Sequence, residues 1–501
     1  MNESVTRAKL KSSERLIAWL LPSMPVLVFA LIFWMSLFFM PQMLNGDGDL
    51  GRHLTTGNYI LATKQIPTRD LFSHTMNGAP LVPKEWLSQV LFALAFHADG
   101  LNGVAWLTAL VLAATFALLT AGLRHLGVRA IVALAAGVAA SIVSALHALA
   151  RPHIFTWFLF ALFLLMLEDY RRNRRWRALW ALPLLMLAWA NLHGAFISGL
   201  TLVAFYAIGA ALERRRRQAA ELVLVEGILI LASFINPVGL QLLAHVFATL
   251  QDRFLVDNTF EFQSPNFHLF SVWPFAALLG FSLGVAWLSQ RRLDWTPLVV
   301  LGGWMMFALY SSRNIPLYAQ AAFVVLAPAA DSLIDEALPA AKRFLARTDE
   351  IDRISFGWVW AVLLVVILVG AEASGAKLDA WGRGNVFDPS VFPVAAVDAL
   401  GSAPPSGDMF NEFTWGGYLL YRMWPAQRVF IDGWTDFYGD TLTREYLQVI
   451  DAEPGWEAIL DRYNVRWVII PPTRALAAAL DASPAWIRRY ADATAVVWVR
   501  R

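Results

Sequence analysis

The chain has 501 residues, of which 58% are hydrophobic and 16% are charged, and its formal net charge at pH 7 is +2. Soluble domains are about 45–50% apolar and about 25% charged, so this composition excludes an ordinary soluble protein and indicates a polytopic membrane protein. The absence of cysteine excludes disulfide bonds, thiolate nucleophiles and cysteine-ligated metals. Because the basic residues are sorted into particular loops, the sequence predicts no nucleic-acid partner.

Eleven apolar stretches predict membrane-spanning helices. The first, 16–40, follows a short basic tail. It is too long for a signal peptide and no small-residue cleavage site follows it, so we expect a retained helix. The other ten are 103–122, 128–149, 154–169, 177–192, 195–212, 219–235, 269–289, 296–311, 315–330 and 354–371.

One further apolar stretch, 86–98, is short for the roughly 30 Å of hydrocarbon in a bilayer. We expect it to be interfacial or re-entrant. If it does cross, a second span has been missed and the protein has about thirteen spans rather than eleven.

Basic residues fall in every second loop, as the positive-inside rule requires. These loops contain Arg124 and Arg129, 171–177, 214–217, Arg291 and Arg292, and 342–353. They are expected to be cytoplasmic, together with the N-terminus. The outer side then receives 41–85, 150–153, 191–194, 236–268, 311–314 and everything after residue 371.

The first outer loop, 41–85, is unusually rich in ionisable residues. It contains Asp47, Asp49, His53, Asp70, His74 and Glu85. A polar loop needs only solvated residues such as Ser, Asn and Lys, whereas carboxylates and imidazoles are typical of proton transfer or cation binding. Other outer turns add Arg151 and His153 in ARPH, His193 in ANLHG and Arg313 in SSRNIP. Ionisable groups at membrane depth usually line a cavity, so we expect an outward-facing cleft.

Most of these residues also have a purely structural interpretation. Asp47 and Asp49 lie between glycines and could cap the helix that follows. His53, four residues after Asp49, could simply form a helical pair with it. Arg151 could extend toward the membrane interface. His193, which precedes a glycine, could mark a turn between two helices.

After residue 371 the long apolar stretches end, and alternating short elements predict a small α/β domain over 372–501. Roughly 120 residues can bury one core without disulfides. Expected strands are 409–413, 428–432, 465–470 and a closing pair ending in 495–499, and expected helices are 391–400, 417–423, 443–450, 456–463 and 473–480. Glu412, Trp415, Asp432, Trp434 and Asp436 could contact a sugar, although a strand end followed by a turn explains the IDG segment equally well.

The aspartate-bearing first loop, the KEWLSQ segment and the ARPH turn before IFTWFLFALFLLML resemble large integral-membrane glycosyltransferases of the GT-C type. This type includes the protein mannosyltransferase and lipid A aminoarabinose transferase branch. In that family the first loop carries a catalytic aspartate, and Asp49 followed by His53 is the best match. The second outer loop often reads Arg-Pro-Asp, whereas this chain has Arg151, Pro152 and His153, which removes one carboxylate from any metal site. WANLHGAF and FIDGWTDFYGD resemble uncharacterised bacterial proteins, which implies a bacterial cytoplasmic membrane.

The resemblance implies a polyprenyl-phosphate sugar as donor, with its lipid among the helices and its phosphate at Arg151 or Arg313. Asp49 or Asp47 would accept the proton of an acceptor hydroxyl that attacks the anomeric carbon with inversion. The substrate-binding candidates are His53, Asp70, His74, Glu85, Arg151, His153, His193 and Arg313. His53, His74 and Glu85 would orient the base or hold a divalent cation, which nothing in the sequence requires. The sugar, the lipid and the acceptor stay open.

Two other function classes, a transporter and a non-catalytic scaffold, each fit part of the sequence. A lipid or sugar transporter predicts mid-span charges and internal repeats, but the halves of this chain do not resemble each other and Glu226 is the main mid-span charge. A non-catalytic scaffold leaves the sorting of ionisable residues to one face unexplained, whereas an inactive relative of a glycosyltransferase would keep part of it.

Overall fold

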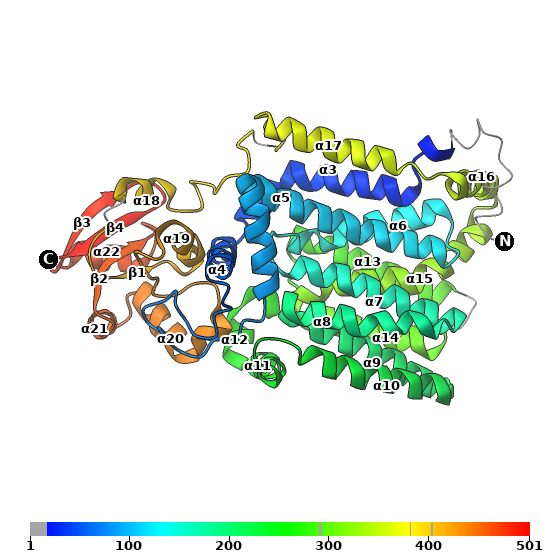
Figure 1. Cartoon of the computed structure of the whole chain (residues 1–501), viewed down its shortest axis with the longest axis horizontal. Helices are drawn as coiled ribbons and strands as arrows, with labels where there is room; N and C mark the ends of the chain where they lie inside the picture. Colours follow the sequence, from blue (N-terminus) through cyan, green and yellow to red (C-terminus); the bar gives the residue numbers. More distant parts are fainter. Residues whose placement is uncertain (1–17, 290–292, 381, 402–403) are drawn as a thin grey trace.

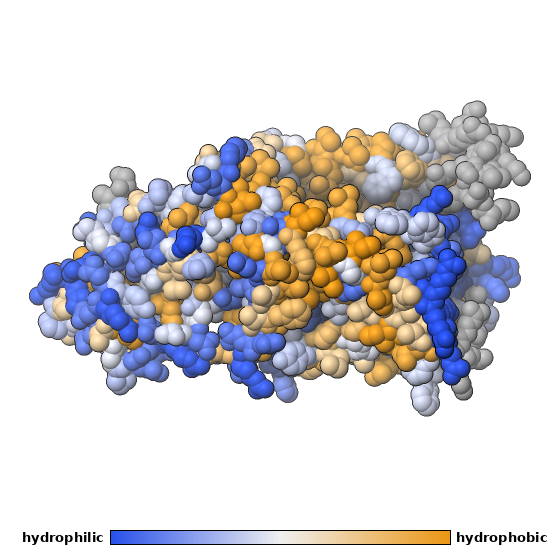
Figure 2. All heavy atoms as spheres, turned by 60° about the horizontal axis from the view of Figure 1, so that its bottom comes forward, coloured by the Kyte–Doolittle hydropathy of each residue, from blue (hydrophilic) through white to orange (hydrophobic). Residues whose placement is uncertain are grey.

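The computed structural model describes residues 18–289, 293–380, 382–401 and 404–501, arranged as a bundle of long helices with a small mixed α/β domain at one end (Figure 1). The basic N-terminal tail and the loop residues Arg291 and Arg292 lie outside the described residues. Apolar side chains cover the flank of the bundle, between the hydrophilic C-terminal domain and a hydrophilic strip at the opposite end (Figure 2).

Each of the eleven expected spans coincides with a helix of the bundle. The helices are α3 (Met24–Asn45), α5 (Trp86–His125), α6 (Ala130–Ser144), α7 (His153–Asn173), α8 (Leu182–Leu192), α9 (Ile197–Leu212), α10 (Arg216–Ser233), α13 (Trp273–Leu288), α14 (Trp295–Tyr310), α15 (Ile315–Ala337) and α17 (Trp358–Ala373). Seven helical segments among the described residues are long and apolar enough to cross a membrane. Of the other expected spans, α8, α14 and α17 are shorter, and α10 carries Arg216, Arg217, Glu221 and Glu226. The protein is therefore a multi-pass membrane protein.

A kink divides α5 into two helical parts. Asp99 and Gly100 leave helical geometry, and Gly100 has a φ of 54°, which glycine adopts without strain. The part before the kink lies across the ends of the long helices instead of along them (Figure 1). The expectation that 86–98 is interfacial or re-entrant stays a prediction.

The C-terminal domain is a four-stranded mixed sheet with helices around it. The strand order is β1-β2-β4-β3, and only the β1–β2 pair is parallel. Its strands are β1 (Asp408–Asn411), β2 (Val465–Ile470), β3 (Trp486–Ala491) and β4 (Val496–Arg500), and its helices are α18 (Val394–Leu400), α19 (Gly416–Met423), α20 (Thr435–Ile450), α21 (Trp456–Arg462) and α22 (Ala475–Ala482). The central strand β2 reads VRWVII and is buried at all positions but one, as expected for a strand covered on both faces.

The prediction of a strand at 428–432 is wrong. In that segment only Val429 makes a β-bridge, and its partner is Ser73 of the first loop. Phe430 N donates instead to the side chain of Asn411 at 2.8 Å. The edge of the sheet beside β1 is therefore closed by side-chain bonds and by the first loop.

The first loop is built into the C-terminal domain. Phe72 and Leu81 are buried in the same apolar clusters as the sheet residues of that domain. The loop helix α4 (Asp49–Thr63) packs against α19 through glycines, since a Cβ on Gly51 would lie 2.4 Å from the carbonyl oxygen of Gly417. This close approach brings the start of α4 to the C-terminal domain.

Candidate functional site

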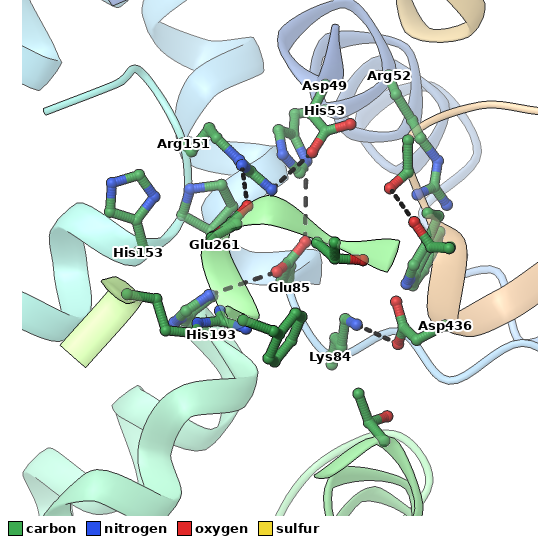
Figure 3. A pocket seen from close by; sticks show the side chains of 18 of the residues that line it. Asp49, Arg52, His53, Lys84, Glu85, Arg151, His153, His193, Glu261 and Asp436 are labelled. Atoms are coloured by element: carbon green, nitrogen blue, oxygen red, sulfur yellow. Dashed lines mark hydrogen bonds and ion pairs between the residues drawn. The ribbon is translucent and has the colours of Figure 1, made fainter. Parts of the chain in front are cut away.

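A cavity of about 740 Å³, partly open to solvent, lies where the first loop, the turns at the same end of the bundle and the C-terminal domain meet (Figure 3). Most of its lining side chains are ionisable or polar. They are Asp49, Arg52, His53, Lys84, Glu85, Arg151, His153, His193, Thr249, Thr259, Glu261, Arg313, Trp434, Thr435 and Asp436, with Pro152, Leu255, Phe262 and Gly433. The cavity thus brings together Asp49, His53, Glu85, Arg151, His153, His193 and Arg313 of the predicted site.

Arg151 of the ARPH turn is the centre of an ion-pair cluster. Its guanidinium nitrogens lie 3.1 Å from Asp47, 2.7 Å from Asp49 and 2.8 Å from Glu261. Three carboxylates thus share one cation, which orients them toward the same point. Burial raises the pKa of Asp47 to about 6, although Arg151 acts in the opposite direction.

The alternative interpretation, in which Asp47 and Asp49 cap the following helix, explains part of this geometry. Asp47 Oδ1 accepts from the backbone N–H of Asp49 at 2.9 Å, while Gly48 occupies the N-cap position of α4 without a side-chain cap. Both aspartates nevertheless pair with Arg151, so neither is only a turn residue. The i,i+4 spacing of α4 also brings His53 to the cavity.

Glu85 lies between two buried imidazoles. Its Oε2 is 4.0 Å from His53 Nδ1, and its Oε1 is 3.6 Å from His193 Nε2 (Figure 3). Burial raises the pKa of Glu85. Burial lowers the pKa of His53, and the positive charge of Arg151 lowers the pKa of His53 further. At neutral pH the His53 ring is therefore uncharged.

The C-terminal domain closes one wall of the cavity with Trp434 and Asp436. The guanidinium carbon of Arg52 lies 3.4 Å from the Trp434 ring centroid, a close cation–π contact, and its Nε is 3.2 Å from Asp432. Burial raises the pKa of Asp432 to about 6. Asp436 is bound by Lys84.

The Asp436 carboxylate links three separate parts of the chain. Besides Lys84 of the first loop, it contacts His245 Nε2 at 2.8 Å; His245 belongs to α11 (Leu240–Gln251). Burial alone would raise the pKa of Asp436, but Lys84 and His245 together lower it. The carboxylate therefore stays charged and holds the wall in place.

Arg313 places a cation in the cavity lining. Within the described residues no carboxylate lies at ion-pair distance from it, although its charge helps to lower the pKa of Glu261. Its guanidinium carbon lies 4.6 Å from the centroid of the Phe262 ring. His153, also in the lining, is held by the backbone carbonyl of His147 at 2.6 Å.

Asp70 and His74, which the sequence placed in the site, lie outside the cavity lining. The Asp70 carboxylate accepts from the N–H groups of Phe72 and Ser73, both at 3.1 Å, and from the Ser73 hydroxyl at 2.6 Å. His74 Nε2 is 2.9 Å from the carbonyl oxygen of Met409. Both residues shape the loop where it enters the C-terminal domain.

Two candidate sugar contacts of the C-terminal domain are also structural. Both oxygens of Glu412 are bound by Arg474, at 2.7 and 2.6 Å, and the Trp415 indole donates to the Val391 carbonyl at 2.8 Å. Both side chains are buried. They stabilise the domain and do not line the cavity.

Three lining residues, Arg52, Lys84 and Glu261, were not predicted from the sequence, nor was His245 behind the wall. Lys84 begins the KEWLSQ segment and Arg52 precedes His53, so adjacency to predicted residues was the available signal. Glu261 and His245 lie in the segment 236–268, which has no distinctive spacing. Their place depends on how this segment folds over the cavity.

The described residues offer no ready-made metal site. No group of three or more His, Cys, Asp or Glu side chains within them has an arrangement that could hold a metal ion. The carboxylates nearest one another, Asp47, Asp49 and Glu261, already share Arg151. The positive charge at this point of the cavity is thus supplied by a guanidinium.

No protein family model matches the chain, and no curated protein matches its sequence. Solved structures do match. The archaeal oligosaccharyltransferase AglB from Archaeoglobus fulgidus, in complex with an inhibitory peptide and a dolichol-phosphate, aligns with a TM-score of 0.55 and 13% identity over 89% of this chain and 68% of AglB. The Archaeoglobus fulgidus oligosaccharyltransferase tethered to an acceptor peptide aligns with a TM-score of 0.53 and 12% identity. This alignment covers 95% of this chain and 74% of that chain.

A shorter structure aligns over nearly its whole length. ArnT from Cupriavidus metallidurans, bound to undecaprenyl phosphate, gives a TM-score of 0.50 and 15% identity over 95% of this chain and 97% of ArnT. Identities this low establish the fold and leave the activity to be argued from the site. The chain has the GT-C fold of integral-membrane glycosyltransferases.

Proposed function

We propose that the protein is a membrane glycosyltransferase that moves a sugar from a polyprenyl-phosphate donor to an acceptor hydroxyl, with inversion at the anomeric carbon. The shared fold supports this class, since AglB was solved with a dolichol-phosphate and ArnT with undecaprenyl phosphate. The proposed orientation places the arginine-rich loops in the cytoplasm and the C-terminal domain outside a bacterial cytoplasmic membrane.

The observation that carries the proposal is the meeting of Asp49 and Arg151 in the cavity. Asp49 comes from the first outer loop and Arg151 from the second, and they pair at 2.7 Å. In the proposed reaction Asp49 accepts the proton of the acceptor hydroxyl as the new C–O bond forms. The bond between the anomeric carbon and the phosphate oxygen breaks, and its electron pair stays on the phosphate.

Arg313 is the better of the two proposed phosphate ligands. Arg151 is already engaged by three carboxylates, whereas Arg313 has none within ion-pair distance among the described residues. An arginine with free N–H groups binds a phosphate through two parallel hydrogen bonds, and these strengthen as charge builds up on the leaving oxygen. We therefore assign the donor phosphate to Arg313.

An apolar groove on the bundle supports a lipid-linked donor. It encloses about 1290 Å³ between α3, α5 and α6 and is lined by residues that include Leu31, Phe39 and Met43. Its lining extends to Leu149, whose side chain lies beside Gly46, next to Asp47. A hydrocarbon chain in this groove would have its phosphate end near the cavity.

The test is a transfer assay with the purified protein in lipid, a panel of polyprenyl-phosphate sugars and a cell-envelope extract. Wild type is compared with Asp49→Asn and with Asp451→Asn, an exposed carboxylate outside the cavity. We expect wild type and Asp451→Asn to release polyprenyl phosphate and folded Asp49→Asn to lose at least about a hundredfold in rate. Equal rates for wild type and Asp49→Asn would show that Asp49 is not the base, and failure of every donor would refute the transferase assignment.

A further inference from the structure

Glu85 differs from the other carboxylates of the cavity because no arginine or lysine binds it. The other three acidic side chains of the lining are Asp49, Glu261 and Asp436, and each is bound by Arg151 or Lys84. Among the described residues, only histidines are within ion-pair distance of Glu85. A carboxylate next to a cation holds a proton weakly, whereas a buried one without such a partner holds it more tightly. Glu85 is therefore the lining carboxylate best suited to take up a proton.

The tautomer of His193 follows from its hydrogen bonds. The Trp189 indole can only donate, and it donates to Thr156 Oγ1 at 2.8 Å. Thr156 Oγ1 lies 2.9 Å from His193 Nδ1, and we infer that its hydroxyl donates there, because no other acceptor for its hydrogen lies within bonding distance among the described residues. The ring hydrogen of neutral His193 therefore lies on Nε2, which faces Glu85 Oε1 at 3.6 Å. All three members of this chain are buried, so the donor is held in place.

On the other side of Glu85, His53 presents a ring nitrogen that carries no hydrogen. The amide nitrogen of Gln89, which can only donate, lies 3.4 Å from His53 Nδ1. The lone pair of the neutral ring is therefore on Nδ1, the atom that faces Glu85 Oε2 at 4.0 Å. Glu85 thus has a hydrogen-bond donor beside one oxygen and, beside the other, an uncharged ring whose Nδ1 lone pair accepts from Gln89. The pair suits a carboxylate that alternates between a charged and a protonated form.

We propose that Glu85 receives the acceptor proton from Asp49 during transfer and holds it until it leaves through the open side of the cavity, with His193 and His53 as positioning residues. This step rests on the proposed function. The proton moves from the acceptor oxygen to Asp49, and then to Glu85 directly or through one water. His193 Nε2–H stabilises charged Glu85, and the uncharged His53 ring places no positive charge beside the protonated form.

The charges around Glu85 favour this direction of transfer. Burial raises the pKa of Glu85, and the carboxylates Asp436 and Asp49 raise it further, whereas Lys84 and Arg151 lower it. Asp49, by contrast, is in direct contact with Arg151 at 2.7 Å. A proton that passes from Asp49 to Glu85 returns Asp49 to its ion pair with Arg151 before the next turnover.

The first experiment needs no substrate. Full-length protein labelled with ¹⁵N-histidine in lipid nanodiscs is titrated, and the His193 signal is assigned by its loss in His193→Gln. In wild type we expect this signal to shift with a midpoint above 4.5, the ordinary glutamate pKa, as Glu85 ionises. The shift should disappear in Glu85→Gln and persist in Glu457→Gln, an exposed control. The same titration in Glu85→Gln would overturn the proposal while leaving the transferase assignment intact.

The second experiment uses the transfer assay. Glu85→Gln should lower kcat about ten- to hundredfold, leave the donor KM unchanged and remove the acidic limb of the pH–rate profile. Glu85→Asp should restore part of the rate and the limb, which a purely structural role does not predict. A Glu85→Gln enzyme with the wild-type profile would overturn the proton transfer. Full activity in Asp49→Asn would instead refute the base assignment on which the inference rests.

Discussion

The Nη2 atom of Arg151 lies 2.7 Å from Oδ2 of Asp49, and this pair joins the first loop to the ARPH turn. The same guanidinium binds Asp47 and Glu261, so three carboxylates share one cation. Removing it leaves three like charges facing one another in a partly buried site.

Replacement of Arg151 should therefore affect both folding and activity. Arg151→Gln is expected to lower the free energy of unfolding by about 2 kcal/mol, because breaking a half-buried cluster leaves uncompensated charge. Arg151→Lys keeps a charge but cannot bridge three carboxylates, so it should recover part of this loss. Thermal unfolding in detergent measures the effect, with the exposed Arg444→Gln as control. Equal unfolding temperatures for Arg151→Gln and wild type would contradict the cluster's role.

The backbone of the IDGW segment sets the position of Asp49. A Cβ on Gly433 would lie 1.8 Å from Asp49 Oδ1, so Gly433→Ala must displace that carboxylate. We expect a loss of at least about tenfold in transfer rate, since small misplacements of a catalytic group are costly. Gly284→Ala, with no atom within 4 Å of the new methyl group, is the control and should keep the wild-type rate. An active Gly433→Ala protein would show that Asp49 need not keep this position.

The burial of Asp432 predicts a pH dependence of stability. Its pKa is about 6 in the folded protein and 3.8 ordinarily, so the folded state keeps this proton up to higher pH than the unfolded chain does. The stabilising contribution is complete below pH 3.8 and is lost as the pH rises through about 6. Wild type should therefore gain about 1 kcal/mol from this group between pH 7 and pH 5.

The measurement for Asp432 is the difference in unfolding temperature between pH 5 and pH 7. Asp432→Asn cannot titrate, so its difference should be smaller than that of wild type. Asp451→Asn, at an exposed position, should retain the wild-type difference. A larger pH effect in Asp432→Asn than in wild type would show that protonation of Asp432 destabilises the folded protein, contrary to this prediction.

Arg313 is expected to act on donor binding. Arg313→Gln removes the cavity arginine that is free of carboxylates, so the KM for the polyprenyl-phosphate donor should rise about ten- to hundredfold. Arg313→Lys keeps the charge but cannot form the bidentate hydrogen bonds. Its donor KM should therefore lie between those of wild type and Arg313→Gln. Initial rates over a range of donor concentrations give this value. An unchanged donor KM in Arg313→Gln would place the phosphate elsewhere.

The transmembrane helices and most elements of the C-terminal domain were predictable because they depend on local pattern. Long apolar stretches specify helices in lipid, since each backbone group must bond within its own segment. The buried strand β2 is visible as the run VRWVII. The segment 428–432 has the same local character, but Asn411 and the first loop occupy its bonding groups. Such competition between distant segments is not visible in a local pattern.

The site was predictable in part for the same reason. Asp49 and Arg151 could be placed on one face of the membrane from topology alone, which brought them within reach of each other. Lys84 and Asp436 are 352 residues apart in sequence, and no spacing rule connects them. Asp70 and His74 carry suitable chemistry, but the loop turns them toward its own backbone and toward β1. Residue type and topology thus select candidates, and long-range packing decides among them.

The threading of the first loop into the C-terminal domain limits how the protein can be divided. A cut at residue 371 separates two lengths of chain but leaves Phe72 and Leu81 on the wrong side of the domain whose interior they fill. A fragment that begins at 372 would expose an apolar gap to water. An exchange of this domain between related proteins must therefore carry the loop with it. The two segments form one folding unit, although most of the bundle separates them in the sequence.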